Sequence, residues 1–178
     1  MHDALKRCLI VFMTVFAVMN YADAQPRSLG TTYSFSGIGI EYEHDLKKDC
    51  FINTDIRTEM LAFFMNKNDI PGISASFSCN FIIREWSSRN DNTISFFAGP
   101  GVTIGISHDF RKDNGFLIGL KGRVGVECWF DRNVAASICL NPIIGSHLTV
   151  VDDHVVMKYY KNGLINAILP EIGIKYTF

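Results

Sequence analysis

The last ten residues of the chain, 169–178, alternate between two kinds of side chain. Apolar or aromatic residues stand at the even positions from 172 onward, and charged or small residues stand at the odd positions from 171 onward. Because successive side chains of an extended strand point to opposite faces, this period of two predicts a strand with one apolar face. Such a strand needs partner strands, so β structure is expected elsewhere in the chain. Its apolar face carries Ile172, Ile174, Tyr176 and Phe178.

The N-terminal stretch has three parts in succession. Lys6 and Arg7 make its start positive, and Cys8–Val18 is an uncharged apolar run. In Ala22-Asp23-Ala24 two small residues are separated by one other residue. This order is typical of a secretory signal peptide. The apolar run is about half as long as the roughly 20 residues that a membrane-spanning helix needs. We therefore expect cleavage before Gln25 and export of the remaining chain.

The expected organisation is a cleaved segment, residues 1–24, followed by a single domain, residues 25–178. The whole chain has a net charge of −1, so nothing in its composition points to a nucleic-acid partner. After the N-terminal stretch no segment is apolar for long enough to cross a bilayer as a helix. If the domain lies in a membrane, it lies there as β-strands.

Four cysteines remain in this domain, at positions 50, 79, 128 and 139. Their spacings fit no zinc pattern, and no metal or other cofactor is expected. An exported protein enters an oxidising compartment, where disulfides are allowed. Cys79 and Cys128 fall on apolar strand faces, where a cysteine behaves as a small hydrophobic residue. We expect four free thiols, Cys50, Cys79, Cys128 and Cys139.

Alternation of period two recurs throughout the domain, with turn signals between the segments. Gln25–Thr32 is expected to be a polar lead-in, and Asn162-Gly163 is expected to be a hairpin turn. Prolines 100, 142 and 170 predict bulges or local edges, because proline cannot donate to a strand ladder. No helix pattern is present. The eight predicted strands are Tyr33–Asp45, Cys50–Met65, Ile73–Trp86, Thr93–Ser107, Phe116–Phe130, Val134–Val150, His154–Lys161 and Leu169–Phe178.

An even number of antiparallel strands joined by short turns predicts an all-β fold, a closed up-and-down barrel. Its apolar face could point inward, as in a soluble barrel, or outward, as in a membrane barrel. The predicted strands are mostly longer than the roughly 9–11 residues of a membrane-spanning strand. Their polar face is rich in glycine and serine, as a narrow lumen requires. Aromatic residues gather near strand ends, as in interfacial girdles: Tyr42, Phe51, Phe110, Trp129, Phe130, Tyr159, Tyr176 and Phe178.

These features favour the membrane orientation. The N-terminal signal, the eight alternating strands, the Phe96–Gly101 stretch and the Ile172–Phe178 ending together resemble the small OmpA/OmpX-like outer-membrane β-barrels. The resemblance implies a transmembrane barrel in a Gram-negative envelope, a terminal strand that the barrel-assembly machinery reads, contact with outer-membrane lipid, and a monomer. Proteins of that family usually have longer external loops than this chain, which disfavours a binding role carried by loops.

Eight strands leave a lumen that side chains fill. In the membrane orientation the inward face carries charges of both signs, and pairing makes buried charge tolerable. We therefore expect a non-conducting, non-enzymatic envelope protein with a polar plug. The predicted lumen set is Glu41, Glu43, Asp55, Arg57, Glu59, Arg84, Lys121, Arg123, Glu127, Glu171 and Lys175.

Two alternatives stay open, a soluble periplasmic lipocalin-like binding barrel and an outer-membrane enzyme acting on lipid. The enzyme would need a nucleophile next to a base. Adjacent residues of a strand point to opposite faces, so Ser107 and His108 cannot form such a pair. With a periplasmic N-terminus, the predicted strands place His108, His147 and His154 at the periplasmic rim and only His44 at the outer rim. The motifs considered are Ser107-His108-Asp109, Ser146-His147 and Asp152-Asp153-His154.

Overall fold

The structure, a computed structural model, describes residues 27–60, 71–87, 92–108, 114–130, 133–151 and 154–178. The expected signal segment and its cleavage site lie outside these ranges. Within them the chain forms ten strands and one short helix. In chain order these are β1 (Arg27–Ser34), β2 (Gly37–Lys47), β3 (Cys50–Glu59), β4 (Gly72–Ser87), β5 (Thr93–His108), β6 (Asn114–Trp129), β7 (Val134–Leu140), β8 (Ile143–Val151), β9 (His154–Tyr159), α3 (Asn162–Asn166) and β10 (Glu171–Thr177).

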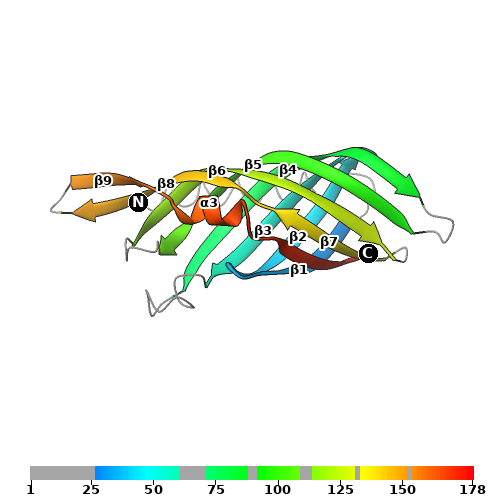
Figure 1. Cartoon of the computed structure of the whole chain (residues 1–178), viewed down its shortest axis with the longest axis horizontal. Helices are drawn as coiled ribbons and strands as arrows, with labels where there is room; N and C mark the ends of the chain where they lie inside the picture. The colour runs from blue at the N-terminus through cyan, green and yellow to red at the C-terminus, as the bar shows by residue number, and fades with distance from the viewer. Residues whose placement is uncertain (1–26, 61–70, 88–91, 109–113, 131–132, 152–153) are drawn as a thin grey trace, which may run out of the picture.

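The strands form one closed antiparallel barrel (Figure 1). Consecutive strands pair from β1 to β6, and β10 pairs with both β1 and β7. β7 and β8 both pair with β6, so they are two halves of one wall position. β9 pairs with β8 and β10 pairs with β7, so these two strands share the next position. The ten segments therefore fill eight positions around the barrel, and the prediction of a closed eight-stranded all-β barrel is confirmed.

The polar lead-in was predicted wrongly, because Arg27–Ser34 is the strand β1. β1 and β2 are joined by a tight turn at Phe35-Ser36, and the predicted first strand, Tyr33–Asp45, runs across it. The turn contains no glycine, proline or asparagine. The Ser34 hydroxyl instead accepts a hydrogen bond from the Ser36 backbone N–H, 3.2 Å away. Serine can organise a turn in this way, but the signal is weak in a sequence.

This extra strand reverses the direction assigned to the strands that come after it. Ser28 pairs with both Thr177 and Glu43, so the start of β1, the end of β10 and the end of β2 lie together at one rim, which we call the termini end. His44 lies at the termini end, opposite Arg27. His108, His147 and His154 lie toward the opposite rim, the far end, where β5, β8 and β9 meet their loops. The predicted placement of the four histidines was therefore wrong.

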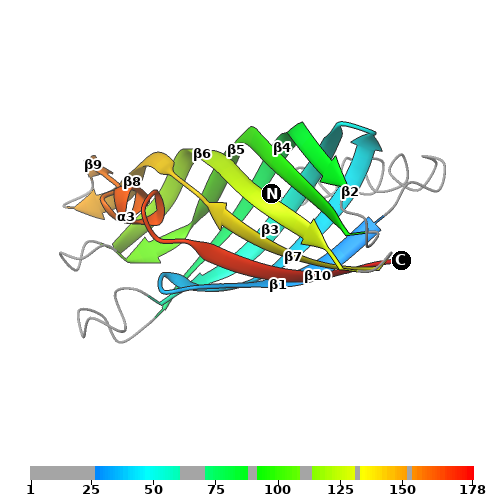
Figure 2. The same ribbon diagram turned by 45° about the vertical axis from the view of Figure 1, so that its right-hand side comes forward.

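The wall between β6 and β1 is interrupted twice (Figure 2). The predicted strand Val134–Val150 breaks at Asn141-Pro142 into β7 and β8. The predicted hairpin turn at Asn162-Gly163 is instead the first turn of α3, which joins β9 to β10. A Cβ on Gly163 would lie 2.0 Å from the Ile143 carbonyl oxygen, so this glycine lets α3 lie directly against β8. Among the described residues no helix is long and apolar enough to cross a membrane.

The pairing of β4 with β5 differs from the prediction in one detail. Pro100 causes no bulge, because β4 and β5 keep the same register on both sides of it, from Ser78↔Gly101 to Phe81↔Ala98. The register shifts nearer the termini end, between Ile82 and Arg84. A bulge of this kind changes which side of the sheet the following residues face.

Large apolar side chains cover the outside of the barrel, and polar side chains line the inside. In β6, for example, Leu120 is 68% exposed and Val126 is 42% exposed, whereas Lys121 and Arg123 are 4% and 3% exposed. The apolar surface therefore points outward, as the membrane orientation requires. Phe51, which was predicted at a strand-end girdle, does not lie there, because it points inward and is 5% exposed.

Candidate functional site

The lumen collects ten of the eleven charged residues that the sequence predicted there. Each of the ten is 8% exposed or less. Arg84 was predicted wrongly: it is exposed, lies just beyond the bulge in β4, and stacks over the Trp86 ring at 5.2 Å. The ten buried residues are Glu41, Glu43, Asp55, Arg57, Glu59, Lys121, Arg123, Glu127, Glu171 and Lys175.

The centre of the charged lumen is Arg123. Its Nη2 atom lies 2.8 Å from Glu41 Oε2 and 3.6 Å from Glu43 Oε1, so one guanidinium holds two carboxylates from the opposite wall. Asn53 links the same two carboxylates, since its Nδ2 donates to Glu41 at 2.9 Å and to Glu43 at 3.2 Å. The guanidinium also lies over the Phe97 ring, 5.5 Å from its centroid. This arrangement fixes two neighbouring anions with one cation and one amide.

Nearer the termini end, Lys175 bridges two carboxylates. Its ammonium group pairs with Glu43 and with Glu127, so β10 is tied to β2 on one side and to β6 across β7. The same ammonium lies 5.6 Å from the Phe51 ring centroid and 5.2 Å from the Trp129 ring centroid. Cation–π contacts of this kind compensate part of the cost of removing an ammonium group from water.

Two further ion pairs cross the middle of the lumen. Lys121 Nζ lies 2.5 Å from Asp55 Oδ2, which connects β6 with β3. Arg57 on β3 pairs with Glu171 on β10. All four side chains are almost completely buried. The ion pairs therefore join strands that do not neighbour one another, and the barrel wall is braced from within.

A different kind of cluster lies toward the far end of the lumen. The Tyr160 hydroxyl donates to Glu59 Oε2 at 3.1 Å, which joins the segment before α3 to the end of β3. The His147 ring stacks on the Tyr160 ring with centroids 5.1 Å apart. Leu117, Ile143 and Tyr160 pack together, and each is 5% exposed or less. Apolar and aromatic groups therefore cap the charged layer on this side.

A second apolar cluster lies on the termini side of Arg123. Phe51, Phe97 and Cys139 are buried together, and the two phenyl rings meet edge to face at 5.2 Å. A glycine on β6 makes room for this cluster, because a Cβ on Gly125 would lie 3.0 Å from Phe97 Cζ and 2.7 Å from Cys139 Sγ. Buried side chains thus occupy the lumen at several levels between its two ends.

The structure describes only parts of the candidate catalytic motifs, and the side chains that it does describe form no nucleophile–base pair. Ser146 and His147 are adjacent in β8, so they face opposite sides of the wall, and His147 is buried in the lumen at 1% exposed. His154 is exposed. Asp109, Asp152 and Asp153 lie outside the described residues, and no side-chain placement is described for Ser107 and His108. Within the described ranges no group of three or more histidine, cysteine, aspartate or glutamate side chains is arranged to hold a metal ion.

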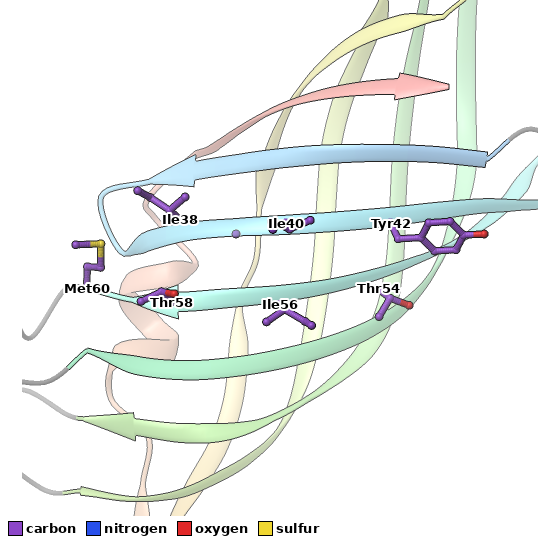
Figure 3. A pocket seen from close by; sticks show the side chains of 8 residues that line it. Ile38, Ile40, Tyr42, Thr54, Ile56, Thr58 and Met60 are labelled. Atoms are coloured by element: carbon purple, nitrogen blue, oxygen red, sulfur yellow. The ribbon is translucent and has the colours of Figure 1, made fainter. Parts of the chain in front are cut away.

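An open groove of about 580 Å³ lies on the outer face of the barrel, between β2 and β3. Figure 3 shows its lining residues along the two strands, with Met60 at one end. Two threonines, Thr54 and Thr58, stand where neighbouring outward positions carry larger side chains, and this difference makes the depression. The lining holds no carboxylate, amine or imidazole, and its only polar side-chain groups are hydroxyls. Its residues are Ile38, Gly39, Ile40, Tyr42, Thr54, Ile56, Thr58 and Met60.

Sequence reasoning missed several lumen residues because it considered only charged groups. Asn53 and Phe97 lie on the inward positions of their strands, so period two alone identifies them. Tyr160 has no such signal, because it comes after a short strand with a poor pattern. The four apolar residues of the terminal strand all lie on the outer surface, between 52% and 67% exposed: Ile172, Ile174, Tyr176 and Phe178.

No protein-family model and no curated protein matches the chain. Among solved structures it is similar to the N-terminal β-barrel domain of Pseudomonas aeruginosa OprF, with a TM-score of 0.52, 9% identity, and 86% of this chain and 96% of that chain covered. It is also similar to Neisserial surface protein A and to Ail of Yersinia pestis, each at 12% identity over 86% of this chain and 94% of the other, with TM-scores of 0.43 and 0.31. These two scores are too low to support an argument. The likeness to the OprF domain and the closed sheet together show that this chain has the fold of the small eight-stranded outer-membrane β-barrels.

Proposed function

We propose that this protein is an integral outer-membrane β-barrel with a plugged, charge-paired lumen, and that it has a structural role in the envelope without conducting ions or catalysing a reaction. Residues 1–24 direct export and are removed, and residues 25–178 form the barrel. The barrel-assembly machinery reads the terminal strand. The mature protein is a monomer surrounded by outer-membrane lipid, with no nucleic-acid partner and no cofactor.

The observation that carries this proposal is the inversion of the barrel. Arg123 and Glu127 are 3% and 6% exposed, while Val126 between them is 42% exposed. In water this arrangement would bury ions and expose hydrocarbon along every strand. In a bilayer it is favourable, because a lysine or arginine on the lipid face at the midplane costs about 2–4 kcal/mol. Hydrocarbon also requires every backbone N–H and C=O to pair within the protein, and a closed sheet provides that pairing.

The absence of conduction is inferred from what occupies the lumen. An ion path needs a continuous hydrated track, whereas nine of the ten buried charged side chains form ion pairs with one another and Glu59 accepts a hydrogen bond from Tyr160. Phe51 and Phe97 lie toward the termini end, and Leu117, Ile143 and Tyr160 lie toward the far end. Between these two clusters the charged side chains form ion pairs with one another. An ion entering this region would have to separate pairs in a medium of low dielectric constant.

Membrane placement is tested by fractionating the envelope and comparing boiled and unboiled samples on a gel. We expect the protein in the outer-membrane fraction and a shift in mobility on boiling. Recovery as a soluble periplasmic protein without that shift would refute the proposal and favour a soluble binding barrel.

Conduction is tested by planar-bilayer recording of the purified barrel, for which we expect no stable conductance. A matched variant, Phe97→Ala with Leu117→Ala and Tyr160→Ala, removes both caps while leaving every lumen charge in place. We expect this variant to show channel events, which establishes that the assay detects an open barrel. Stable channels in the unchanged protein would contradict the plugged lumen.

The role of the terminal strand is tested by deleting Phe178 and, as a control, replacing it in Phe178→Tyr. We expect the deletion to reduce the amount of folded barrel in the outer membrane, while export and signal cleavage continue. The tyrosine variant keeps an aromatic ring at the end of the outward face and is expected to assemble. Normal yield of protease-resistant barrel from the deletion would show that Phe178 is not read as a signal.

A further inference from the structure

The four cysteines of the barrel lie in three different environments. Cys139 is buried in the lumen at 1% exposed, with its Sγ 3.7 Å from Arg123 Nη2. Cys128 is partly exposed on the outer face of β6. Cys50 and Cys79 are both partly exposed, and their Sγ atoms are 3.6 Å apart. Among these cysteines, this pair has its two sulfurs in contact.

The Cys50–Cys79 pair lies at the edge of the pairing between β3 and β4. Cys50 is the first residue of β3 and pairs with Phe81, while Cys79 pairs with Ile52, so the two cysteines are diagonal neighbours on the outer face. β4 continues to Ser87, well past the start of β3. Next to the pair, the last backbone bond between the two segments runs from the Ile82 N–H to the Asp49 carbonyl, at 2.9 Å. The cysteines therefore lie where the β3–β4 ladder ends.

We propose that Cys50 and Cys79 form an oxidative modification site, at which a disulfide closes once the barrel has folded and staples β3 to β4 at the termini end. Both cysteines are free thiols in this structure. Closing the bond requires the sulfurs to approach from 3.6 Å to about 2.0 Å. Cys50 comes directly after a turn, and its pair with Phe81 is the first of the β3–β4 register, so no earlier residue pair of these two strands restrains it.

The reaction is a thiol–disulfide exchange with a disulfide donor. The thiolate of one cysteine attacks a donor sulfur and releases one donor thiolate, which leaves a mixed disulfide. The thiolate of the second cysteine then attacks the mixed disulfide and releases the donor as a dithiol. The two cysteines lose two electrons and two protons, and the donor gains them. In a cell the donor would be a periplasmic dithiol oxidase, so the physiological part of the inference rests on the proposed export.

The test separates this chemistry from export. The full-length chain carrying Cys8→Ser is folded in detergent micelles, reduced, freed of reductant and incubated with oxidised glutathione. Free thiols are then counted with a maleimide reagent after denaturation, and peptides are mapped by mass spectrometry. We expect two of the four thiols to disappear, with Cys50 and Cys79 joined in one peptide pair. The matched control, Cys128→Ser, is expected to lose the same two thiols.

Replacing either partner should prevent the loss. In Cys50→Ser and in Cys79→Ser we expect all three remaining thiols to stay titratable. Four free thiols in the folded chain, mixed glutathione disulfides alone, or a disulfide that includes Cys128 or Cys139 would each overturn the proposal. None of these outcomes depends on where the protein resides, so the outer-membrane proposal would stand or fall separately.

Discussion

The barrel wall has two unlike parts. In β2–β6, which we call the continuous wall, strands of 10 to 16 residues pair without interruption of the strand itself. In β7–β10 with α3, which we call the interrupted wall, strands of 6 to 9 residues are separated by Asn141-Pro142 and by a helix of five residues. The difference shows two ways of closing the same barrel.

The two parts satisfy their backbone groups differently. The continuous wall uses strand ladders throughout. At the breaks of the interrupted wall, single bonds replace the ladder: the Gly122 N–H donates to the Pro142 carbonyl at 2.8 Å, and the Tyr160 N–H donates to the Gly145 carbonyl at 2.9 Å. A closed barrel therefore tolerates a proline and a helical turn where local bonds restore the pairing that hydrocarbon demands.

The side chains behind the two parts also differ. Asn53, behind the continuous wall, donates to two carboxylates. Asn141, at the break between β7 and β8, is 2% exposed, and neither its Nδ2 nor its Oδ1 has a hydrogen-bond partner among the described residues. Buried amides without partners destabilise a fold, because their lost hydration is not replaced. We infer that the continuous wall contributes more to stability, and variants can test that difference.

The largest effect is expected from breaking the ion network that the continuous wall supports. Arg123→Met leaves Glu41 and Glu43 buried without their shared guanidinium, and removing one partner of a buried pair costs about 3–5 kcal/mol. Unfolding by urea from detergent micelles measures the change. Arg84→Met is the matched control, and because Arg84 is exposed we expect a change within about 0.5 kcal/mol. Equal losses in the two variants would show that burial of Arg123 adds nothing.

An intermediate effect is expected from comparing the two buried asparagines. Asn53→Leu removes the amide that donates to Glu41 and Glu43, but both carboxylates keep Arg123, so we expect a loss of about 1.5–3 kcal/mol, as for a single hydrogen bond to a charged group. Asn141→Leu removes an amide without described partners and should be neutral or stabilising. The same urea titration compares both with the unchanged protein. If Asn141→Leu is destabilised as strongly as Asn53→Leu, the contrast between the two walls is wrong.

The smallest effect is expected from disturbing α3 within the interrupted wall. In Gly163→Ala the new methyl would lie 2.0 Å from the Ile143 carbonyl oxygen, so α3 must move away from β8. Overpacking of this kind costs about 1–3 kcal/mol. Limited proteolysis between Tyr160 and Pro170 should become faster than in the unchanged protein. Gly122→Ala is the control, because its new methyl would meet a proline ring carbon at 3.1 Å. Equal proteolysis of the two variants would argue against close packing of α3.

The sequence predicts the continuous wall well because its alternation has high contrast. In β5 and β6, glycine or charged residues alternate with isoleucine, valine and leucine, and only one register buries all the charges. β1 lacks that contrast, since Gly30 and Thr32 alternate with Thr31, and the turn after it depends on a serine. Missing it displaced the histidines to the wrong rim, because each added strand reverses the direction of the next.

The interrupted wall and the details of the lumen were harder to predict for physical reasons. Asn162-Gly163 has the composition of a hairpin turn, but contact of Gly163 with β8 decides its conformation, and a sequence does not show that contact. The alternation of β4 would place Arg84 in the lumen. The bulge between Ile82 and Arg84 changes the side of the sheet that Arg84 faces. Sequence parity places charges in the lumen, whereas the choice of partners, such as Lys175 with both Glu43 and Glu127, depends on barrel closure.

The central claim is that the apolar face of the barrel contacts lipid while the charged face is enclosed, and quenching by acyl-brominated phospholipids tests it directly. In a background of Trp86→Phe and Trp129→Phe, one tryptophan is introduced outward at Val126→Trp or inward at Phe97→Trp. These positions are 42% and 1% exposed. We predict strong quenching of the outward tryptophan and little quenching of the inward one. Quenching of the inward tryptophan alone, or of neither one in the reconstituted, folded protein, would contradict the account.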